Sequence, residues 1–197
     1  MPRLALCAMI FGLIIIGCSH DPDRYTAKDI VKITNFELSP DESKIAFSAI
    51  TPVGNLDIWV VDIDGKNLKK LTFQDRSLTN YTAKFFKKRR WRNFFEIDMI
   101  SPKWTTDGRI SFCQELSKSD MWSTRTVNFM FWTINSDGTN KKPKTDKDKV
   151  VQKEEPSPIR TFKISDLSDK YKKEIFLKYG TLWYLNYGET TPKRLIQ

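Results

Sequence analysis

The feature that most constrains the fold is a segment that occurs more than once along the chain. Residues 56 to 72 and residues 131 to 145 both contain an alternating apolar run with a tryptophan, then an Asp-Gly pair, then a short polar run. Tight hairpin turns hold a central residue at positive φ, a conformation that Asp-Gly pairs favour. Each copy is therefore predicted to be two antiparallel strands joined by a turn. The equivalent residues are Trp59 and Trp132, Gly65 and Gly138, and, in a third and weaker copy, Trp183.

A second hairpin precedes each of these copies. Residues 36 to 47 contain the turn sequence Ser39-Pro40-Asp41, and residues 104 to 112 contain Asp107-Gly108 at the same point. Proline, aspartate and glycine favour turns for different steric reasons. The complete repeat is thus predicted to be a four-stranded antiparallel meander.

The third copy leaves one element open. Residues 165 to 180 have apolar side chains every four positions before Gly180, which is typical of a helix. The alignment with the earlier copies instead makes Ile175-Phe176-Leu177 the second strand of the repeat. We predict the strand.

The repeat resembles the TolB-type (WD40-like) β-propeller repeat. The resemblance rests on Leu38-Ser39-Pro40-Asp41 with Ile45-Ala46-Phe47, and on residues 57 to 62 with Asp64-Gly65 and Leu71-Thr72. It covers residues 33 to 73 well. The second copy, residues 100 to 145, has Thr105-Thr106 in place of Ser-Pro and a long middle loop, and the third, residues 159 to 196, keeps mainly its tryptophan hairpin.

The resemblance implies an all-β fold, a partial or short β-propeller of four-stranded antiparallel blades with about three repeats, in residues 29 to 197. It also implies a periplasmic or cell-surface scaffold in which the repeated tryptophans pack between blades. Closed propellers have about four to eight blades. Three blades therefore predict an open arc, a truncated propeller or a ring that another chain completes, with self-association and a free edge at residues 193 to 196.

The N-terminus predicts export. Arg3 and the uncharged apolar run from Leu4 to Ile16 have the length of a secretory signal peptide, residues 1 to 17. The run ends in Gly17-Cys18-Ser19, which resembles a bacterial lipobox and implies that Cys18 receives fatty acids such as palmitate. Residues 18 to 28 form a polar tether. Ser19 stands where an Asp would retain the protein at the inner membrane, so the outer membrane, facing the periplasm, is favoured; the alternative is a plain signal peptide or short anchor with an incidental Cys18.

The composition argues against catalysis. The chain has one histidine, His20, which lies in the tether, so the folded part has no Ser/His/Asp or Cys/His relay. Only Cys113 lies outside the N-terminal segment, which excludes an internal disulfide. We predict no catalytic residue, no metal site and no cofactor. Asp57, Asp62 and Asp120 are the carboxylates that an acid/base enzyme would use instead.

Two segments interrupt the repeats. Residues 141 to 158 are polar and proline-rich and predict a mobile linker. Residues 75 to 99 predict an insertion, in which residues 84 to 95 contain six basic and five aromatic residues. This composition suits anionic lipid or another polyanion, and the alternative is aromatic packing on the fold with the charges in water. The candidate binding residues are Lys84, Lys87, Lys88, Arg89, Arg90, Trp91 and Arg92.

The sequence therefore predicts a non-catalytic envelope lipoprotein that binds the membrane through its lipid and an unidentified envelope protein or polymer through its propeller. Nucleic acid is not expected as a partner in that compartment. The alternatives are a polyanion binder that uses residues 84 to 95, and a truncated propeller domain of a polysaccharide-acting or peptidase-type enzyme.

Overall fold

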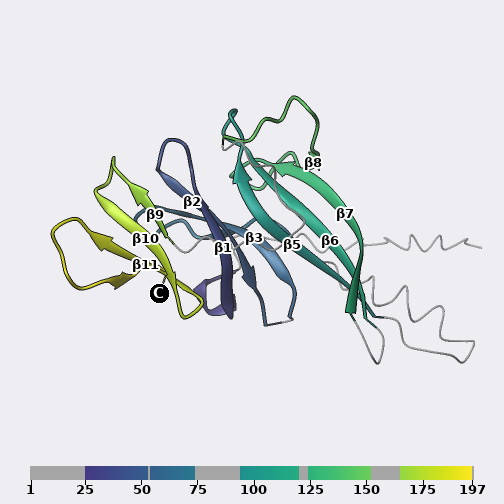
Figure 1. Ribbon diagram of the computed structural model, residues 1–197, viewed down its shortest axis with the longest axis horizontal. Helices are drawn as coiled ribbons and strands as arrows, with labels where there is room; N and C mark the ends of the chain where they lie inside the picture. The colour runs from purple at the N-terminus through teal and green to yellow at the C-terminus, as the bar shows by residue number, and fades with distance from the viewer. Residues whose placement is uncertain (1–24, 53, 74–93, 120–123, 152–164, 197) are drawn as a thin grey trace, which may run out of the picture.

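The computed structural model describes residues 25–52, 54–73, 94–119, 124–151 and 165–196. Within these ranges the chain forms three four-stranded antiparallel sheets, and the helical structure is limited to the 3-10 turn η2 (Ala27–Asp29). The strands of each sheet follow one another in sequence order, as Figure 1 shows. This confirms the all-β fold and the four-stranded meander as the repeating unit. The described residues do not form a closed ring.

The first sheet contains β1 (Lys32–Leu38), β2 (Lys44–Ile50), β3 (Leu56–Asp62) and β4 (Lys69–Lys70). The second contains β5 (Phe94–Trp104), β6 (Ile110–Ser119), β7 (Thr124–Ile134) and β8 (Lys142–Pro143). The third contains β9 (Ser165–Ser168), β10 (Lys173–Lys178), β11 (Thr181–Asn186) and β12 (Lys193–Arg194). The prediction of a strand at residues 175 to 177 is confirmed by β10.

The strand register shows that the three sheets are equivalent position by position. In each sheet an aromatic residue of the second strand lies opposite the tryptophan of the third strand, and that tryptophan lies opposite a residue of the short fourth strand. The matched sets are Phe47, Trp59 and Lys70; Phe112, Trp132 and Pro143; and Phe176, Trp183 and Arg194.

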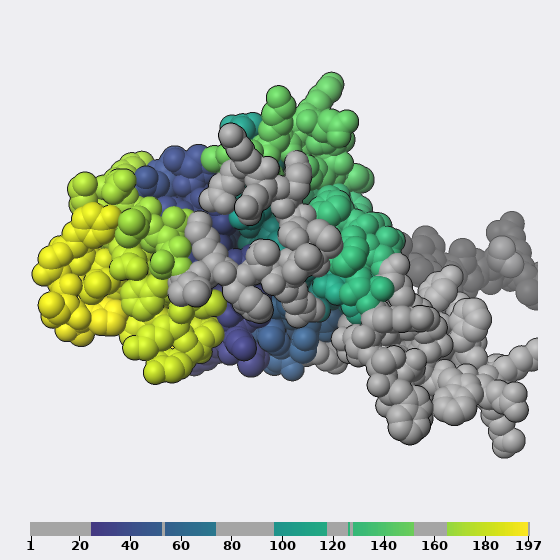
Figure 2. All heavy atoms as spheres, in the orientation of Figure 1, coloured from purple at the N-terminus to yellow at the C-terminus, as the bar shows by residue number. Residues whose placement is uncertain are grey.

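The sheets do not lie in sequence order. The third sheet packs against one face of the first sheet, and the second sheet packs against the other face. Figures 1 and 2 show the resulting row, with the first sheet in the middle and the third and second sheets at its two ends. The third sheet, although it follows the second in sequence, therefore lies on the opposite side of the first sheet.

We call the face of each sheet that carries the tryptophan its tryptophan face, and the other its small face. Successive residues of a strand point to opposite faces. The tryptophan face of the second sheet packs on the small face of the first, and the tryptophan face of the first packs on the small face of the third, which includes Ile175 and Leu182. Phe176 and Trp183, one position along in register, therefore point away from the first sheet.

The predicted tryptophan core is confirmed in full only for Trp59, whose side chain is completely buried. Trp132 is half-buried and packs against the cluster between the first and second sheets. Trp183 is also half-buried, but it belongs to none of the buried clusters that the described residues form. The same repeat position thus has three different environments.

Two predicted interruptions are wrong in part. Residues 94 to 99, predicted as insertion, are the first half of β5, and the predicted middle loop of the second copy is a long hairpin of β6 and β7. Residues 75 to 93, the rest of the predicted insertion, lie outside the described part of the chain. The extra length was missed because the first copy, with which the second was aligned, has strands of only seven residues, whereas β5 and β7 have 11.

The predicted linker at residues 141 to 158 is also wrong over its first part. Residues 142 and 143 form β8, Thr105 bridges Val150, and the Thr106 N–H donates to the carbonyl oxygen of Lys149 (2.8 Å). Asp148 is 5% exposed and lies 3.2 Å from the Arg109 guanidinium. Burial of Asp148 opposes its ionisation, but hydrogen bonds from Thr145 and Arg109 outweigh it and lower its pKa to about 2. Polar contacts therefore hold residues 142 to 150 against the second sheet. The prediction failed because it looked for apolar periodicity, which this segment lacks.

The predicted free edge at residues 193 to 196 needs a similar correction. Lys193 and Arg194 are exposed on β12, the last strand of its sheet. Leu195 and Ile196 are instead buried in the cluster between the first and third sheets. The chain turns inward after β12 because these two side chains complete that core.

Candidate functional site

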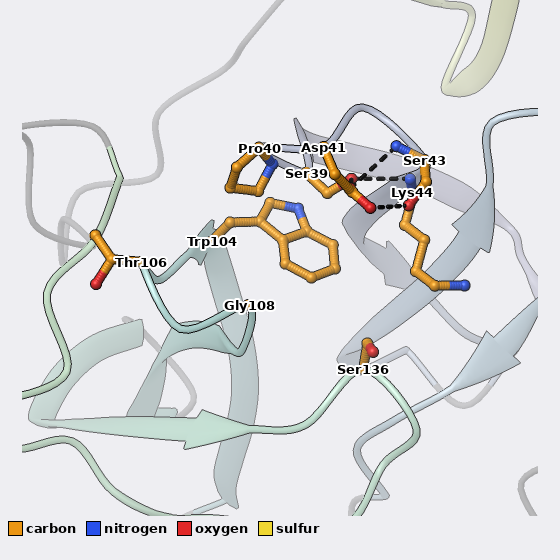
Figure 3. A pocket seen from close by; sticks show the side chains of 9 residues that line it. All are labelled: Ser39, Pro40, Asp41, Ser43, Lys44, Trp104, Thr106, Gly108 and Ser136. Carbon is orange, nitrogen blue, oxygen red and sulfur yellow. Dashed lines mark hydrogen bonds between the residues drawn. The ribbon is translucent and has the colours of Figure 1, made fainter.

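A cavity of about 320 Å³ lies at one end of the interface between the first and second sheets. It lies where the turn between β1 and β2 meets the turns that follow β5 and β7, as Figure 3 shows. Pro40 and the indole of Trp104 form its apolar part, and polar groups surround them. The lining residues are Ser39, Pro40, Asp41, Ser43, Lys44, Trp104, Thr106, Gly108 and Ser136.

The carboxylate of Asp41 is fixed by its own turn. The Ser39 and Ser43 hydroxyls each donate a hydrogen bond to it at 2.6 Å, and the Ser43 N–H adds a third at 3.2 Å. These donors, the Ser39 hydroxyl first, lower the pKa of Asp41 to about 2. Asp41 is therefore ionised at neutral pH and cannot supply a proton there.

The second sheet builds the same turn with different residues. Ser39 accepts the Lys44 N–H at 2.9 Å, and Thr105 accepts the Arg109 N–H at 3.0 Å. The Thr105 hydroxyl also donates to Asp107 at 2.5 Å. The threonine that departs from the Ser-Pro pattern thus keeps the hydroxyl on which the turn depends.

In the third sheet the equivalent hydroxyl is that of Ser168, which is fully buried. It accepts the Tyr171 N–H at 3.2 Å and donates to Glu42 of the first sheet at 2.8 Å. A serine or threonine at the end of the first strand of each repeat, or directly after it, is the signal that the sequence contains for this turn. Its role is structural in all three sheets.

Two further polar groups of the cavity, those of Lys44 and Trp104, are also engaged. The Lys44 ammonium lies 2.5 Å from the Asp62 carboxylate, which accepts a second hydrogen bond from Asn67 at 2.6 Å. Trp104 is 4% exposed, and its indole N–H donates to the carbonyl oxygen of Glu37 at 3.1 Å. The cavity therefore presents a rigid apolar floor and a rim of fixed charges, an arrangement suited to binding.

The carboxylates considered for acid/base chemistry are not brought together at a cleft. Asp57 is buried between β3 and β4, where the Lys70 ammonium lies 2.9 Å away and the Thr72 hydroxyl donates at 2.9 Å. The rings of Tyr25, Trp59 and Phe73 surround that ammonium at 4.4, 5.7 and 5.4 Å. Asp62 reaches the cavity only through Lys44, and Asp120 lies outside the described residues.

Two predicted sites also lie outside the described residues, namely the lipidation site Cys18 and the basic segment from Lys84 to Arg92. Cys113 is buried and has no disulfide partner among the described residues. Burial, followed by the nearby charge of Glu115, raises its pKa to about 12, so it is a thiol at neutral pH. The described ranges contain no group of acidic, histidine or cysteine side chains that would hold a metal ion. They also contain no helix long and apolar enough to cross a membrane.

Comparison with known proteins adds little to this description. No model of a known protein family matches the chain, and no curated protein matches it. Among solved structures, the chain is similar to a protein from Agrobacterium tumefaciens provisionally assigned as TolB, with a TM-score of 0.24 and 12% sequence identity. The match covers 82% of this chain and 64% of that one, so the chain spans less than two thirds of its length. The blade-like architecture therefore rests on the equivalent registers of the three sheets.

Proposed function

We propose that the protein is a non-catalytic bacterial envelope lipoprotein whose three blade-like sheets form a scaffold for binding an envelope protein or polymer. The observation that carries the proposal is the cavity between the first and second sheets. Its shape comes from three turns that are each held by hydrogen bonds of their own side chains, so it is preorganised. A preorganised site loses little entropy when it binds a partner.

The protonation of the cavity supports binding over catalysis. A general acid or base works best with a pKa near the working pH. Asp41 has its pKa lowered to about 2, and Lys44 is held by Asp62. Asp41 is therefore not arranged to exchange a proton near neutral pH, and the Ser39 and Ser43 hydroxyls beside it are held in its hydrogen bonds.

Binding at the cavity is tested by filling it. Ser136→Arg places a long side chain at the rim, and Thr191→Arg places the same side chain on an exposed turn of the third sheet as the control. Two probes are used: a photoreactive amino acid at position 106 in living cells, for a protein partner, and co-sedimentation with purified peptidoglycan sacculi, for a polymer. We expect Ser136→Arg to abolish the cross-link or the co-sedimentation, and Thr191→Arg to leave it unchanged. Equal behaviour of both variants and the wild type would refute binding at this cavity.

The lipid anchor is supported by the sequence pattern that ends at Cys18. Metabolic labelling with a radioactive fatty acid should mark the wild type and not Cys18→Ser. Cys7→Ser, which lies within the predicted signal peptide, is the matched control and should be labelled normally. Labelling of Cys18→Ser would refute the anchor.

The alternative function, polyanion binding, is favoured by the six basic and five aromatic residues of residues 84 to 95. Electrostatic binding of this kind weakens as salt is added. If it operates, replacing Lys87, Lys88, Arg89 and Arg90 with serine should abolish binding to vesicles containing anionic lipid, and 0.5 M salt, about ten times a low-salt buffer, should do the same to the wild type. Binding that persists in either condition would refute this alternative.

A further inference from the structure

The third sheet ends the row with a face that the other two sheets bury. The residue that directly precedes the hydroxyl residue of the first turn is Trp104 in the second sheet and Leu167 in the third. Trp104 is 4% exposed, whereas Leu167 is 59% exposed. Phe47 and Phe112 are fully buried at the position where Phe176 is half-buried. The third sheet thus keeps the apolar residues of an inter-sheet contact without a covering sheet among the described residues.

The two contacts already present show what this face is built to do. In both, a tryptophan face packs on another sheet through its central Phe and Trp pair. Phe176 and Trp183 form the same cross-strand pair in the third sheet, flanked by Leu167 and Leu185. Aromatic residues at the centre of an apolar patch are typical of the residues that dominate binding energy.

The opposite end of the row has a different composition. On the small face of the second sheet, Ser111, Cys113 and Thr133 are 0% exposed, whereas Phe129 and Phe131 are 38% and 37% exposed. This face pairs Cys113 with Phe131 and carries no counterpart of the Phe176 and Trp183 pair. We therefore consider the contact in which two copies bring the same face of the third sheet together.

The charges on the tryptophan face are arranged for such a self-contact. Glu174, Phe176 and Lys178 lie at alternate positions of β10 and so point to the same side. A two-fold axis between two such faces, running across the strands at Phe176, places Glu174 of each chain opposite Lys178 of the other. It also stacks the aromatic pairs at the centre. Arg194 lies opposite Trp183 on the outermost strand, so the same axis brings the two Arg194 side chains together at the exposed edge of the contact.

We propose that the tryptophan face of the third sheet is a dimer interface, which binds the same face of a second copy about this two-fold axis. A closed contact between identical surfaces is the commonest symmetry of protein oligomers. The interface would hide Leu167, Phe176, Trp183 and Leu185 from water, as the two existing contacts hide their equivalents.

A charge exchange tests the interface without touching the core. The full chain is studied by sedimentation velocity in density-matched detergent over a range of concentrations. Glu174→Lys places lysines opposite each other twice in the dimer, and Lys178→Glu does the same with glutamates. We expect each single variant to raise the dimer dissociation constant about tenfold, and the double variant Glu174→Lys/Lys178→Glu to restore it to within about threefold of the wild type.

Two further variants distinguish the proposed aromatic contact from non-specific hydrophobic association. Trp183→Ala should weaken the dimer about 30-fold, as expected for a central aromatic residue. Tyr179→Ser removes a more exposed aromatic side chain, 91% exposed in the turn after β10, and should leave the dissociation constant unchanged. Circular dichroism confirms that each variant is folded.

Three results would overturn the proposal. The first is a wild-type monomer at every concentration, and the second is a dimer that neither single charge variant weakens. The third is a double variant that stays as weak as the single ones. A monomer that forms a cross-link to a different protein from position 183 would show that a foreign partner covers this face instead.

Discussion

The first and third sheets derive from the same repeat but differ in how their two faces are used. In β2 of the first sheet all five central residues are buried, whereas in β10 of the third sheet only Ile175 is buried. The first sheet lies between two neighbours, and the third has one. The difference shows that the number of neighbouring sheets, rather than the repeat itself, decides whether a strand is buried on one face or on both.

Hydrogen bonds also seal the two contacts of the first sheet in different ways. Towards the second sheet, Asp98 accepts the Leu56 N–H and the Asn55 side chain donates to the carbonyl oxygen of Ile97, both at 2.9 Å. Towards the third sheet, the Ile33 N–H donates directly to the carbonyl oxygen of Gly180 at 2.7 Å. Both contacts satisfy backbone groups that packing alone would leave buried without partners.

The largest predicted difference between the first and third sheets concerns their tryptophans. Trp59→Ala removes a fully buried side chain and should lower the free energy of unfolding by about 3 to 5 kcal/mol. Trp183→Ala should lower it by only about 1 kcal/mol, because half-exposed side chains leave no closed cavity when they are truncated. Denaturant unfolding of dilute protein, followed by circular dichroism, measures both values. Equal losses would mean that the third sheet is covered in the monomer.

A smaller difference is expected for two turn glycines. Gly65 has a φ of 85°, and a Cβ added to it would lie 2.2 Å from the carbonyl oxygen of Leu195, which joins the third sheet to the first. Gly108 has a φ of 77° but nothing within 4 Å of the same position. Gly65→Ala should therefore cost about 3 kcal/mol and Gly108→Ala about 1 kcal/mol, the cost of the left-handed backbone alone.

The same unfolding measurement checks this comparison. If the two glycine variants were equally stable, the C-terminal residues would not pack against the turn of the first sheet. In that contradicting case, Leu195→Ala would lower the free energy of unfolding by the same amount in the Gly65→Ala background as in the wild type.

The turn carboxylate gives a smaller, pH-dependent difference. The first sheet has Asp41 in its first turn, and the third sheet has Lys170 at the equivalent position. Because the pKa of Asp41 falls from 3.8 to about 2 on folding, its contribution is complete above pH 4 and is lost as the pH falls towards 2. Asp41→Asn should cost about 1 kcal/mol at pH 7, a value reduced by solvent screening of this exposed group.

The pH profile distinguishes this explanation from a general packing defect. The stability difference between Asp41→Asn and the wild type should shrink between pH 4 and pH 2. A difference that stays constant over this range would contradict the assigned role of the Ser39 and Ser43 hydroxyls.

The smallest effect compares the outer faces at the two ends of the row and changes no stability. Cys113, fully buried with a pKa of about 12, should not react with iodoacetamide at pH 8 in the native protein. Leu167→Cys, at a position 59% exposed on the third sheet, should react like a free thiol in the dilute monomer. Peptide mapping by mass spectrometry separates the two thiols. Rapid labelling of Cys113 would show that the outer face of the second sheet opens.

The sequence alone determined the local structure of this protein. The Asp-Gly pairs and the hydroxyl residues at Ser39, Thr105 and Ser168 specify turns through bonds that span only a few residues, so the four-stranded meander and its three copies were predictable. The tryptophan positions were predictable for the same reason, since the alternation along a strand fixes which residues share a face. The turns and the strand faces within a repeat could therefore be predicted from the sequence of that repeat alone.

The tertiary structure decided everything that depends on contacts between repeats. The return of the third sheet to the first, the docking of residues 142 to 150 through Arg109 and Asp148, and the cavity between two sheets all join residues far apart in the chain. No local propensity encodes such contacts, because the same Phe and Trp pair is buried in one sheet and half-exposed in another. The burial of each copy depends on which sheets pack against it. That packing depends on how the apolar faces of the three sheets cover one another, because burying apolar surface lowers the free energy.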